Sequence, residues 1–276
     1  MAITAAAVNE LRKMTGAGMM DCKKALQEVD GDFEAAIDLL RKKGQKISAK
    51  RADRDATEGA VIARSSADYT TGVIVRLSCE TDFVAKNADF IALADKIADI
   101  ALENKPADVD ALKALNIDGE TIAERLTNEM GKIGEKIDVT NYVIINGSSV
   151  INYIHAGNKI GVLVELSLGS NNDIVEAGKD VAMQIAAMNP ISVGEADIPQ
   201  DVKERELEIG REQARAEGKP EQIIDKIAEG KLQRFYKDNT LTKQQFVKDS
   251  SVTVEQMLKN IDNNLSVVSF SRIALG

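Results

Sequence analysis

The chain has 276 residues, of which 44% are hydrophobic and 29% are charged, and its formal net charge is −9. This composition is typical of a globular protein with one large domain or about two to three small ones. The negative charge argues against a nucleic acid duplex as the partner, because proteins that bind duplexes usually carry a basic surface.

Membrane insertion and an oxidising compartment are also disfavoured. No apolar run approaches the roughly 18 residues that span a bilayer, and the first residues lack the charged and apolar blocks of a signal peptide. The two cysteines, Cys22 and Cys79, lie far apart and form no C-x-x-C pair. We therefore expect buried, reduced thiols in a cytoplasmic protein.

Three short helices are predicted at the amino terminus. Thr4 can cap a helix over residues 5–14, and a loop with two glycines, Gly16 and Gly18, follows it. A second helix over 19–29 places four residues on one apolar face: Met19, Cys22, Leu26 and Val29. A third begins at Phe33 and is expected to stop at Gly44. Together they predict a small three-helix bundle.

Met20 does not fit this packing pattern, because it shares the polar face of the second helix with Lys23, Lys24 and Gln27. Methionine suits adaptable contact surfaces, but a single exposed apolar residue is also common. The residues beyond the bundle, 41–54, are rich in lysine and arginine and are interpreted as a linker. A solvated tether is the favoured interpretation of this segment over a contact with RNA or an acidic protein.

An internal repeat organises the next region. The run Gly72 to Ser78 (GVIVRLS) matches Gly161 to Ser167 (GVLVELS), and each run follows a shorter β-branched segment. Each copy is therefore expected to open with a hairpin and to continue into a helix that ends before a proline, Pro106 or Pro190. Helices mixed with hairpins predict an α+β fold with a core of two related subdomains.

The two copies differ in length at one place. Gly72 and Gly161 lie 89 residues apart, whereas Pro106 and Pro190 lie only 84 apart. The first copy therefore has five more residues between its strand and its proline. The segment Thr81 to Asn87 falls in that longer interval, and it carries Phe83 between Asp82 and Lys86. Because loops carry function more often than the scaffold does, this aromatic side chain is easier to explain as a contact with a partner than as core.

A polar helical hairpin is predicted after Pro190. Helices over 200–217 and 221–237 are separated by glycine and proline, which favour a helix end and a helix start. They should form a protruding antiparallel pair. The expected seam consists of Val202, Ile209 and Ala216 against Ile224, Ile227 and Phe235. A helix over 254–261 and a closing strand over 265–275 complete the chain.

The sequence offers little catalytic chemistry. It contains no P-loop motif, no His-Glu-x-x-His and no cluster of cysteines and histidines, so neither a P-loop nucleotide hydrolase nor a zinc site is expected. The one histidine, His155, has no evident nucleophile partner and is more typical of a strand residue. These observations favour a binding protein without a metal or cofactor over an enzyme.

Several segments, in the right order, resemble the elongation factor Ts family. They are Leu11 to Leu26 (LRKMTGAGMMDCKKAL), Cys79 to Asn87 (CETDFVAKN), Lys132 to Glu135 (KIGE) and His155 to Val164 (HAGNKIGVLV). The resemblance covers essentially the whole chain. Some relatives have a further helical module after the closing strand, near which this sequence ends.

The resemblance implies a function and a set of contacts. Members of the family are guanine nucleotide exchange factors for the translational GTPase elongation factor Tu. By resemblance, Thr81, Asp82, Phe83 and Val84 would intrude near the partner's magnesium ion and displace it. Further partner contacts would come from Arg12, Met19, Met20, Lys23, Ile133, Gly134 and His155.

The resemblance also implies a domain arrangement. It consists of a bundle resembling the ubiquitin-associated type with its linker (1–54), a first core subdomain (55–145), a second (146–190 and 238–276) and a hairpin insertion (191–237). The hairpin could pack on its own subunit, on a second copy as a homodimer, or on the partner. A structural adaptor that uses the bundle and hairpin, and a small enzyme that uses His155, are the alternative functions.

Overall fold

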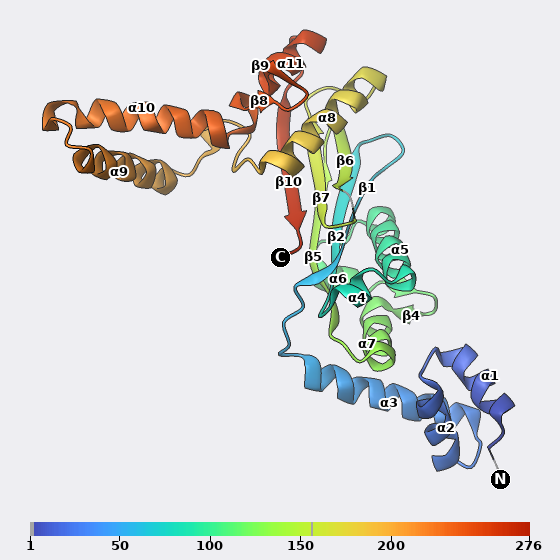
Figure 1. Ribbon diagram of the computed structural model, residues 1–276. Coiled ribbons are helices and arrows are strands. Elements are labelled where there is room, and N and C mark those ends of the chain that lie inside the picture. Colours follow the sequence, from blue (N-terminus) through green and yellow to red (C-terminus); the bar gives the residue numbers. More distant parts are fainter. Residues whose placement is uncertain (1–2, 156) are drawn as a thin grey trace. The chain divides into compact units, whose positions relative to one another are not determined.

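The computed structural model describes residues 3–155 and 157–276. Groups of helices and strands alternate along the chain, which confirms the α+β prediction (Figure 1). Two three-stranded sheets have the orders β1-β2-β5 and β10-β7-β6. None of the helices in these described stretches combines the length and apolarity that crossing a bilayer requires.

The chain divides into two compact units. One comprises residues 1–62, 75–143 and 274–276, and the other comprises 63–74 and 144–273. The domain boundaries predicted from the sequence stay a prediction.

The first unit begins with the three predicted helices, α1 (Ala5–Thr15), α2 (Met19–Glu28) and α3 (Phe33–Arg51). Thr4 caps α1 as predicted, since its hydroxyl oxygen accepts from the Ala7 nitrogen at 3.1 Å. The helices enclose a small common core of Val8, Leu11, Ala17, Cys22, Ala25, Leu26 and Ala36.

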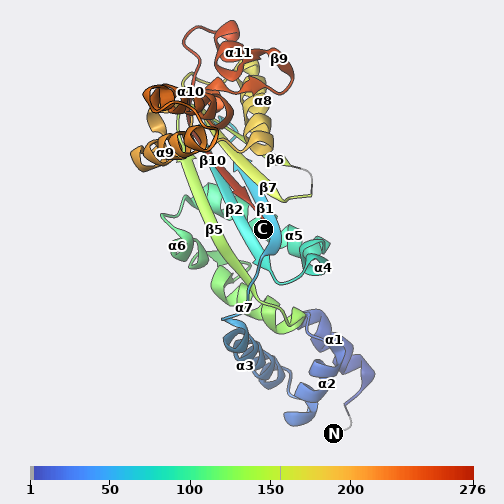
Figure 2. The ribbon, with the colours of Figure 1, turned by 60° about the vertical axis from the view of Figure 1, so that its left-hand side comes forward.

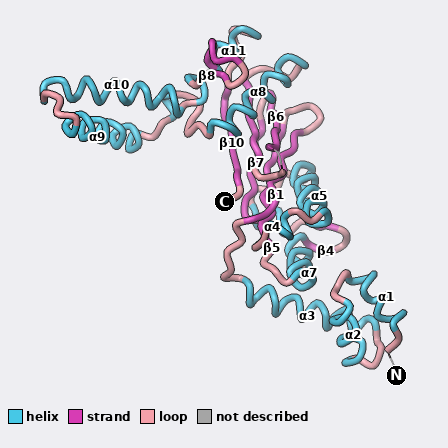
Figure 3. The backbone as a smooth tube through the Cα atoms, viewed as in Figure 1, coloured by secondary structure: helices cyan, strands magenta, loops and turns pink. Residues whose placement is uncertain are grey.

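The predicted end of the third helix was wrong. α3 runs without interruption through Gly44 to Arg51 (Figure 3), so most of the expected linker is helical. Gly44 is buried, and a Cβ there would lie 3.7 Å from the Cα of Gly131 in α7. This glycine therefore permits close packing of two helices and does not terminate one.

Strands β1 (Glu58–Ser65) and β2 (Thr71–Cys79) form the first repeat, and β6 (Ser149–His155) and β7 (Ile160–Leu166) form the second. β6 and β7 pair antiparallel, with Ile151 opposite Val164. Two 17-residue helices follow, α5 (Ala88–Asn104) and α8 (Asn172–Met188). Each ends at a left-handed residue directly before the predicted proline, which confirms the repeat.

The longer interval of the first repeat holds the segment around Phe83, as predicted. A single helical turn, α4 (Asp82–Ala85), lies between β2 and α5. The chain continues through α6 (Val109–Lys113), β3 (Asn116–Ile117), β4 (Glu120–Thr121), α7 (Ile122–Ile133) and β5 (Ile137–Asn146).

In the second unit, α8 packs on β6 and β7, with Ile151, Val164 and Val181 in one buried cluster. The rest of the unit comprises a 3-10 turn (Glu195–Asp197), α9 (Gln200–Ala216), α10 (Glu221–Asn239), a second 3-10 turn (Leu241–Lys243), β8 (Gln245–Phe246), β9 (Asp249–Thr253), α11 (Val254–Ile261) and β10 (Val267–Ala274).

Helices α9 and α10 form the predicted hairpin and lie side by side (Figures 1 and 2). The predicted seam was wrong in part, because Ile209 and Ala216 are exposed. The buried residues of the pair are Gly210, Ala214, Ile224, Ala228, Leu232 and Tyr236. A Cβ at Gly210 would lie 3.0 Å from the Cα of Ala228, so small residues occupy the line of closest approach.

Candidate functional site: an exposed phenylalanine on an anchored helical turn

Phe83 lies on α4, and its side chain is 84% exposed. Thr81 begins this turn with an extended backbone, and its hydroxyl oxygen faces the Val84 nitrogen at 3.5 Å. Asp82 and Lys86 bracket the turn with an ion pair of 2.6 Å. That hydrogen bond and the charge of Lys86 lower the pKa of the Asp82 carboxyl. The aromatic ring is thus presented to solvent on a locally closed turn and takes no part in a core.

The start of α4 is fixed by a residue distant in sequence. Glu135 accepts from the Thr81 hydroxyl at 2.7 Å and from the Thr81 backbone nitrogen at 3.0 Å. Glu135 follows Gly134, whose left-handed backbone (φ 81°) ends α7. The two hydrogen bonds that Thr81 donates to this one carboxylate restrict both the position and the orientation of Thr81, because charge-assisted bonds of this kind are short and directional.

Glu80, the residue before Thr81, is also held by several hydrogen bonds. Arg51 Nη1 lies 2.8 Å and 2.7 Å from the two carboxylate oxygens of Glu80, and the Lys136 backbone nitrogen donates to the same carboxylate at 2.6 Å. Burial raises the pKa of Glu80, but the bonds from Lys136 and Arg51 outweigh it and lower the pKa below its ordinary value. The carboxylate is therefore ionised at neutral pH and paired on both sides.

Lys136 extends this arrangement to the chain beyond α3. Its ammonium group donates to the carbonyl oxygens of Ala52 at 2.6 Å and Arg54 at 2.9 Å. Three segments distant in sequence thus meet behind Phe83: the end of α3, the residues Glu80 and Thr81, and the turn after α7. We call this set of contacts the α4 anchor.

The bundle presents three exposed methionines, Met14, Met19 and Met20. Met20 is 61% exposed, as its place on the polar face predicted. The core position predicted for Met19 was wrong, since its side chain is 52% exposed. Met19 occupies the first residue of α2, and the bundle core extends along that helix only over Cys22, Ala25 and Leu26.

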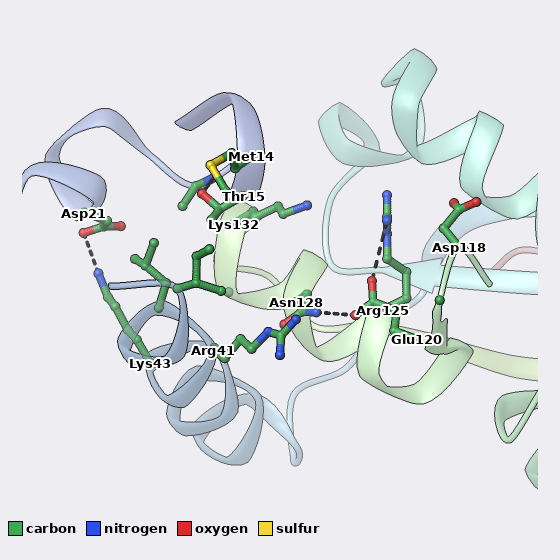
Figure 4. A pocket seen from close by; sticks show the side chains of 16 residues that line it. Met14, Thr15, Asp21, Arg41, Lys43, Asp118, Glu120, Arg125, Asn128 and Lys132 are labelled. Atoms are coloured by element: carbon green, nitrogen blue, oxygen red, sulfur yellow. Dashed lines mark hydrogen bonds and ion pairs between the residues drawn. The ribbon is translucent and has the colours of Figure 1, made fainter. Parts of the chain in front are cut away.

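Two cavities open within this unit. One, of about 320 Å³, lies between the bundle and α7 and is lined by charged side chains that include Arg41, Lys43 and Arg125 (Figure 4). Several of these side chains are paired, as Lys43 is with Asp21 and Arg125 with Glu120. The other, of about 500 Å³, lies between Gly16, the first turns of α5 and the end of α7 at Ile133. The second cavity places the glycine loop of the bundle near the helix that follows α4.

Comparison with known proteins identifies the family. The family model described as elongation factor TS matches residues 80–276. Proteins named elongation factor Ts from Christiangramia forsetii and Cytophaga hutchinsonii are each 54% identical over 274 residues, covering 99% of both chains. The protein of that name from Porphyromonas gingivalis is 48% identical over 278 residues, covering 100% of this chain and 99% of its own.

The chain belongs to the elongation factor Ts family.

The structure brings some of the contact residues expected from the elongation factor Ts resemblance together. Asp82, Phe83 and Val84 lie in α4, which Thr81 caps. Ile133 ends α7 and Gly134 caps it. Glu135, the next residue, accepts two hydrogen bonds from Thr81. Ile133 is exposed and Val84 is half-buried. Arg12 and Lys23 are exposed on the bundle.

His155 belongs to the other unit, at the end of β6. Its Nδ1 lies 3.2 Å from the hydroxyl of Tyr153, and the side chain is exposed. The contact roles of all these residues stay predictions.

The elongation factor Ts segments contained a residue whose importance was missed. Glu135 lies in the segment Lys132 to Glu135, where the resemblance predicted partner contacts only for Ile133 and Gly134. Its distance in sequence from Thr81 hides the contact, and the same is true of Arg51 and Glu80. A polar residue directly after a helix-ending glycine was the only local signal.

Proposed function

We propose that the chain is a guanine nucleotide exchange factor that binds elongation factor Tu with GDP, displaces the partner's magnesium ion and promotes GDP release during translation elongation. The single observation that carries this proposal is Phe83, a phenylalanine with 84% exposure on the anchored turn α4. Family membership supports it, and a binding role needs no reactive centre in the chain itself.

In this proposal Phe83 wedges between helices of the partner, with Asp82 beside it. A bound magnesium ion is often the largest local charge in a phosphate site. Its displacement would weaken the hold on the nucleotide directly. The anchored α4 suits such a wedge, because a backbone segment held in advance loses less conformational freedom on binding.

The burial of Phe83 alone cannot supply the free energy that nucleotide exchange requires. Weakening nucleotide binding about ten-thousandfold requires a coupling free energy of roughly 5.5 kcal/mol. Burying one phenylalanine side chain contributes about 1.5–3 kcal/mol. The exchange reaction therefore needs an extended interface. We assign the additional contacts to Arg12, Met19, Met20, Lys23, Ile133, Gly134 and, in the second unit, His155.

The coupling between the two ligands is reciprocal. If this chain weakens the affinity of elongation factor Tu for GDP, then GDP must weaken the affinity for this chain by the same factor. The exchange factor would consequently dissociate once a new nucleotide is bound.

The test is the release of fluorescent GDP from purified elongation factor Tu, followed by stopped flow with and without the chain. Acceleration that saturates with the concentration of the chain would support exchange activity. An adaptor that merely binds the GTPase would leave the release rate unchanged, and so would an enzyme with chemistry at His155.

A further inference from the structure

Two helices of the first unit cross at a pair of glycines. Gly44 of α3 faces Gly131 of α7, and a Cβ built on Gly131 would lie 2.8 Å from the Gly44 Cα. In the reverse direction, a Cβ on Gly44 would lie 3.4 Å from the Thr127 carbonyl oxygen and 3.7 Å from the Gly131 Cα. The backbones of α3 and α7 are therefore in direct contact at this crossing.

The close approach explains why residue 131 is glycine, whereas a Cβ at Gly44 would only reach ordinary van der Waals contact. Both lie inside helices with ordinary helical backbones, where glycine is less favourable than alanine. Neither position requires a left-handed conformation, so conformational freedom gives no reason for the choice. The missing side chain therefore matters for the close approach of α3 and α7 and for no backbone conformation.

Both crossing helices lead directly to the α4 anchor. α7 ends at Ile133, and Glu135 just beyond it holds Thr81. α3 ends at Arg51, which is paired with Glu80. The other end of α3 belongs to the bundle that presents Met20. The crossing thus lies between the exposed methionines and Phe83.

A second contact joins the bundle to α7. The Lys132 side chain lies along the glycine loop of the bundle, where a Cβ at Gly16 would be 3.1 Å from both Cε and Nζ of Lys132. Glu129 holds the Lys132 ammonium group at 3.0 Å. Two consecutive residues of α7, Gly131 and Lys132, thus lie against two different parts of the bundle, α3 and the glycine loop.

We propose that Gly44 and Gly131 are positioning residues that fix the separation between the bundle's contact surface and Phe83, so that both engage the GTPase at once. The inference rests on the proposed exchange function. When two contact sites are held at the right separation, binding of the second follows at high effective concentration. A change in this separation should weaken binding of the chain to the GTPase. It should have a smaller effect on the rate of GDP release once the complex has formed.

Three alanine substitutions form a graded test. Gly131→Ala forces α3 and α7 apart by about 1 Å, because carbon atoms in contact prefer separations of about 3.5–4.0 Å. Gly44→Ala is milder, since its nearest neighbour would be at 3.4 Å. Gly230→Ala is the matched control, because it also lies inside a helix, α10, and its Cβ would meet nothing within 4 Å.

Two measurements are made on each full-length variant. The first is the distance between spin labels on cysteines introduced at the exposed positions Lys24 of the bundle and Ala88 beside α4, while the native cysteines are buried. The second is stopped-flow release of fluorescent GDP over a range of exchange factor concentrations. It separates the half-saturating concentration from the maximal rate.

We expect Gly131→Ala to lengthen the label distance and to raise the half-saturating concentration about tenfold, with the maximal rate within about twofold of the original. Gly44→Ala should stay close to the original chain in both measurements, because its Cβ would only reach van der Waals contact. If Gly131→Ala does not fold, Gly44→Val carries the test, since its two further methyl groups extend from a Cβ that already lies 3.4 Å from the Thr127 carbonyl oxygen. Unchanged distances, or a lengthened distance with kinetics equal to those of Gly230→Ala, would overturn the inference. A failure of the unsubstituted chain to accelerate release would instead contradict the proposed function.

Discussion

Glu135 accepts two hydrogen bonds from Thr81, a residue 54 positions earlier in the chain. The bonds come from the backbone nitrogen and from the hydroxyl of the same residue, so one carboxylate holds the start of α4 at two points. This contact ties the turn that carries Phe83 to the end of α7. It fixes the backbone directly before the exposed Phe83.

The first prediction concerns this carboxylate. Glu135→Ala should destabilise the fold by about 1.5–3 kcal/mol, the usual cost of losing hydrogen bonds to a charged group. It should also lower the maximal rate of stimulated GDP release, because α4 is no longer held. Urea unfolding and stopped-flow release measure the two effects separately.

Glu135→Gln is the conservative comparison, since its amide oxygen can still accept one of the two bonds. Its exchange activity should fall between those of the unsubstituted chain and Glu135→Ala. Equal activity of all three proteins would show that the Thr81 contact has no part in exchange.

The second prediction is a pH dependence at Glu80. Its pKa in the folded chain is below the ordinary value of 4.5. A carboxyl with a lowered folded pKa stabilises the fold fully above its unfolded pKa, and this stabilisation is lost as the pH falls through the folded pKa. The difference in unfolding free energy between the original chain and Glu80→Gln should therefore be constant above about pH 4.5 and shrink below it. Urea denaturation across this range would contradict the assignment if the difference did not change.

The sequence was sufficient for the elements whose signal is local. The match of Gly72 to Ser78 with Gly161 to Ser167 predicted β2 and β7, because buried strands require runs of apolar β-branched residues. The prolines predicted the ends of α5 and α8. The extra length of the first repeat predicted that an additional feature lies at Phe83.

Misinterpreted residues are those whose role depends on a distant segment. Gly44 has the local character of a helix end, yet Gly131 across the crossing determines its use. The hairpin seam was assigned to large apolar residues such as Ile209, whereas Gly210 and Ala228 allow the closest approach. The Thr81–Glu135 bonds likewise join residues that no periodicity relates.

The third prediction concerns Met20. Its side chain is exposed in the free chain, so Met20→Ala should change the unfolding free energy by less than about 0.5 kcal/mol. If it is buried against the GTPase, its loss should remove roughly 1.5–3 kcal/mol of binding, about tenfold or more in the half-saturating concentration. Titration of stimulated GDP release measures this value.

Met188→Ala serves as the control for Met20, because Met188 is also exposed but lies in the second unit outside the expected contacts. Its half-saturating concentration should equal that of the unsubstituted chain. Equal values for the two alanine variants would remove Met20 from the interface.

The most direct test of the central claim is stopped-flow release of fluorescent GDP from elongation factor Tu with saturating Phe83→Ala. Because Phe83 is 84% exposed, the variant should melt at the same temperature as the original chain. We predict a maximal stimulated rate lower by about tenfold or more, the equivalent of the roughly 1.5–3 kcal/mol that a buried phenylalanine contributes. A maximal rate equal to that of the unsubstituted chain would contradict the account.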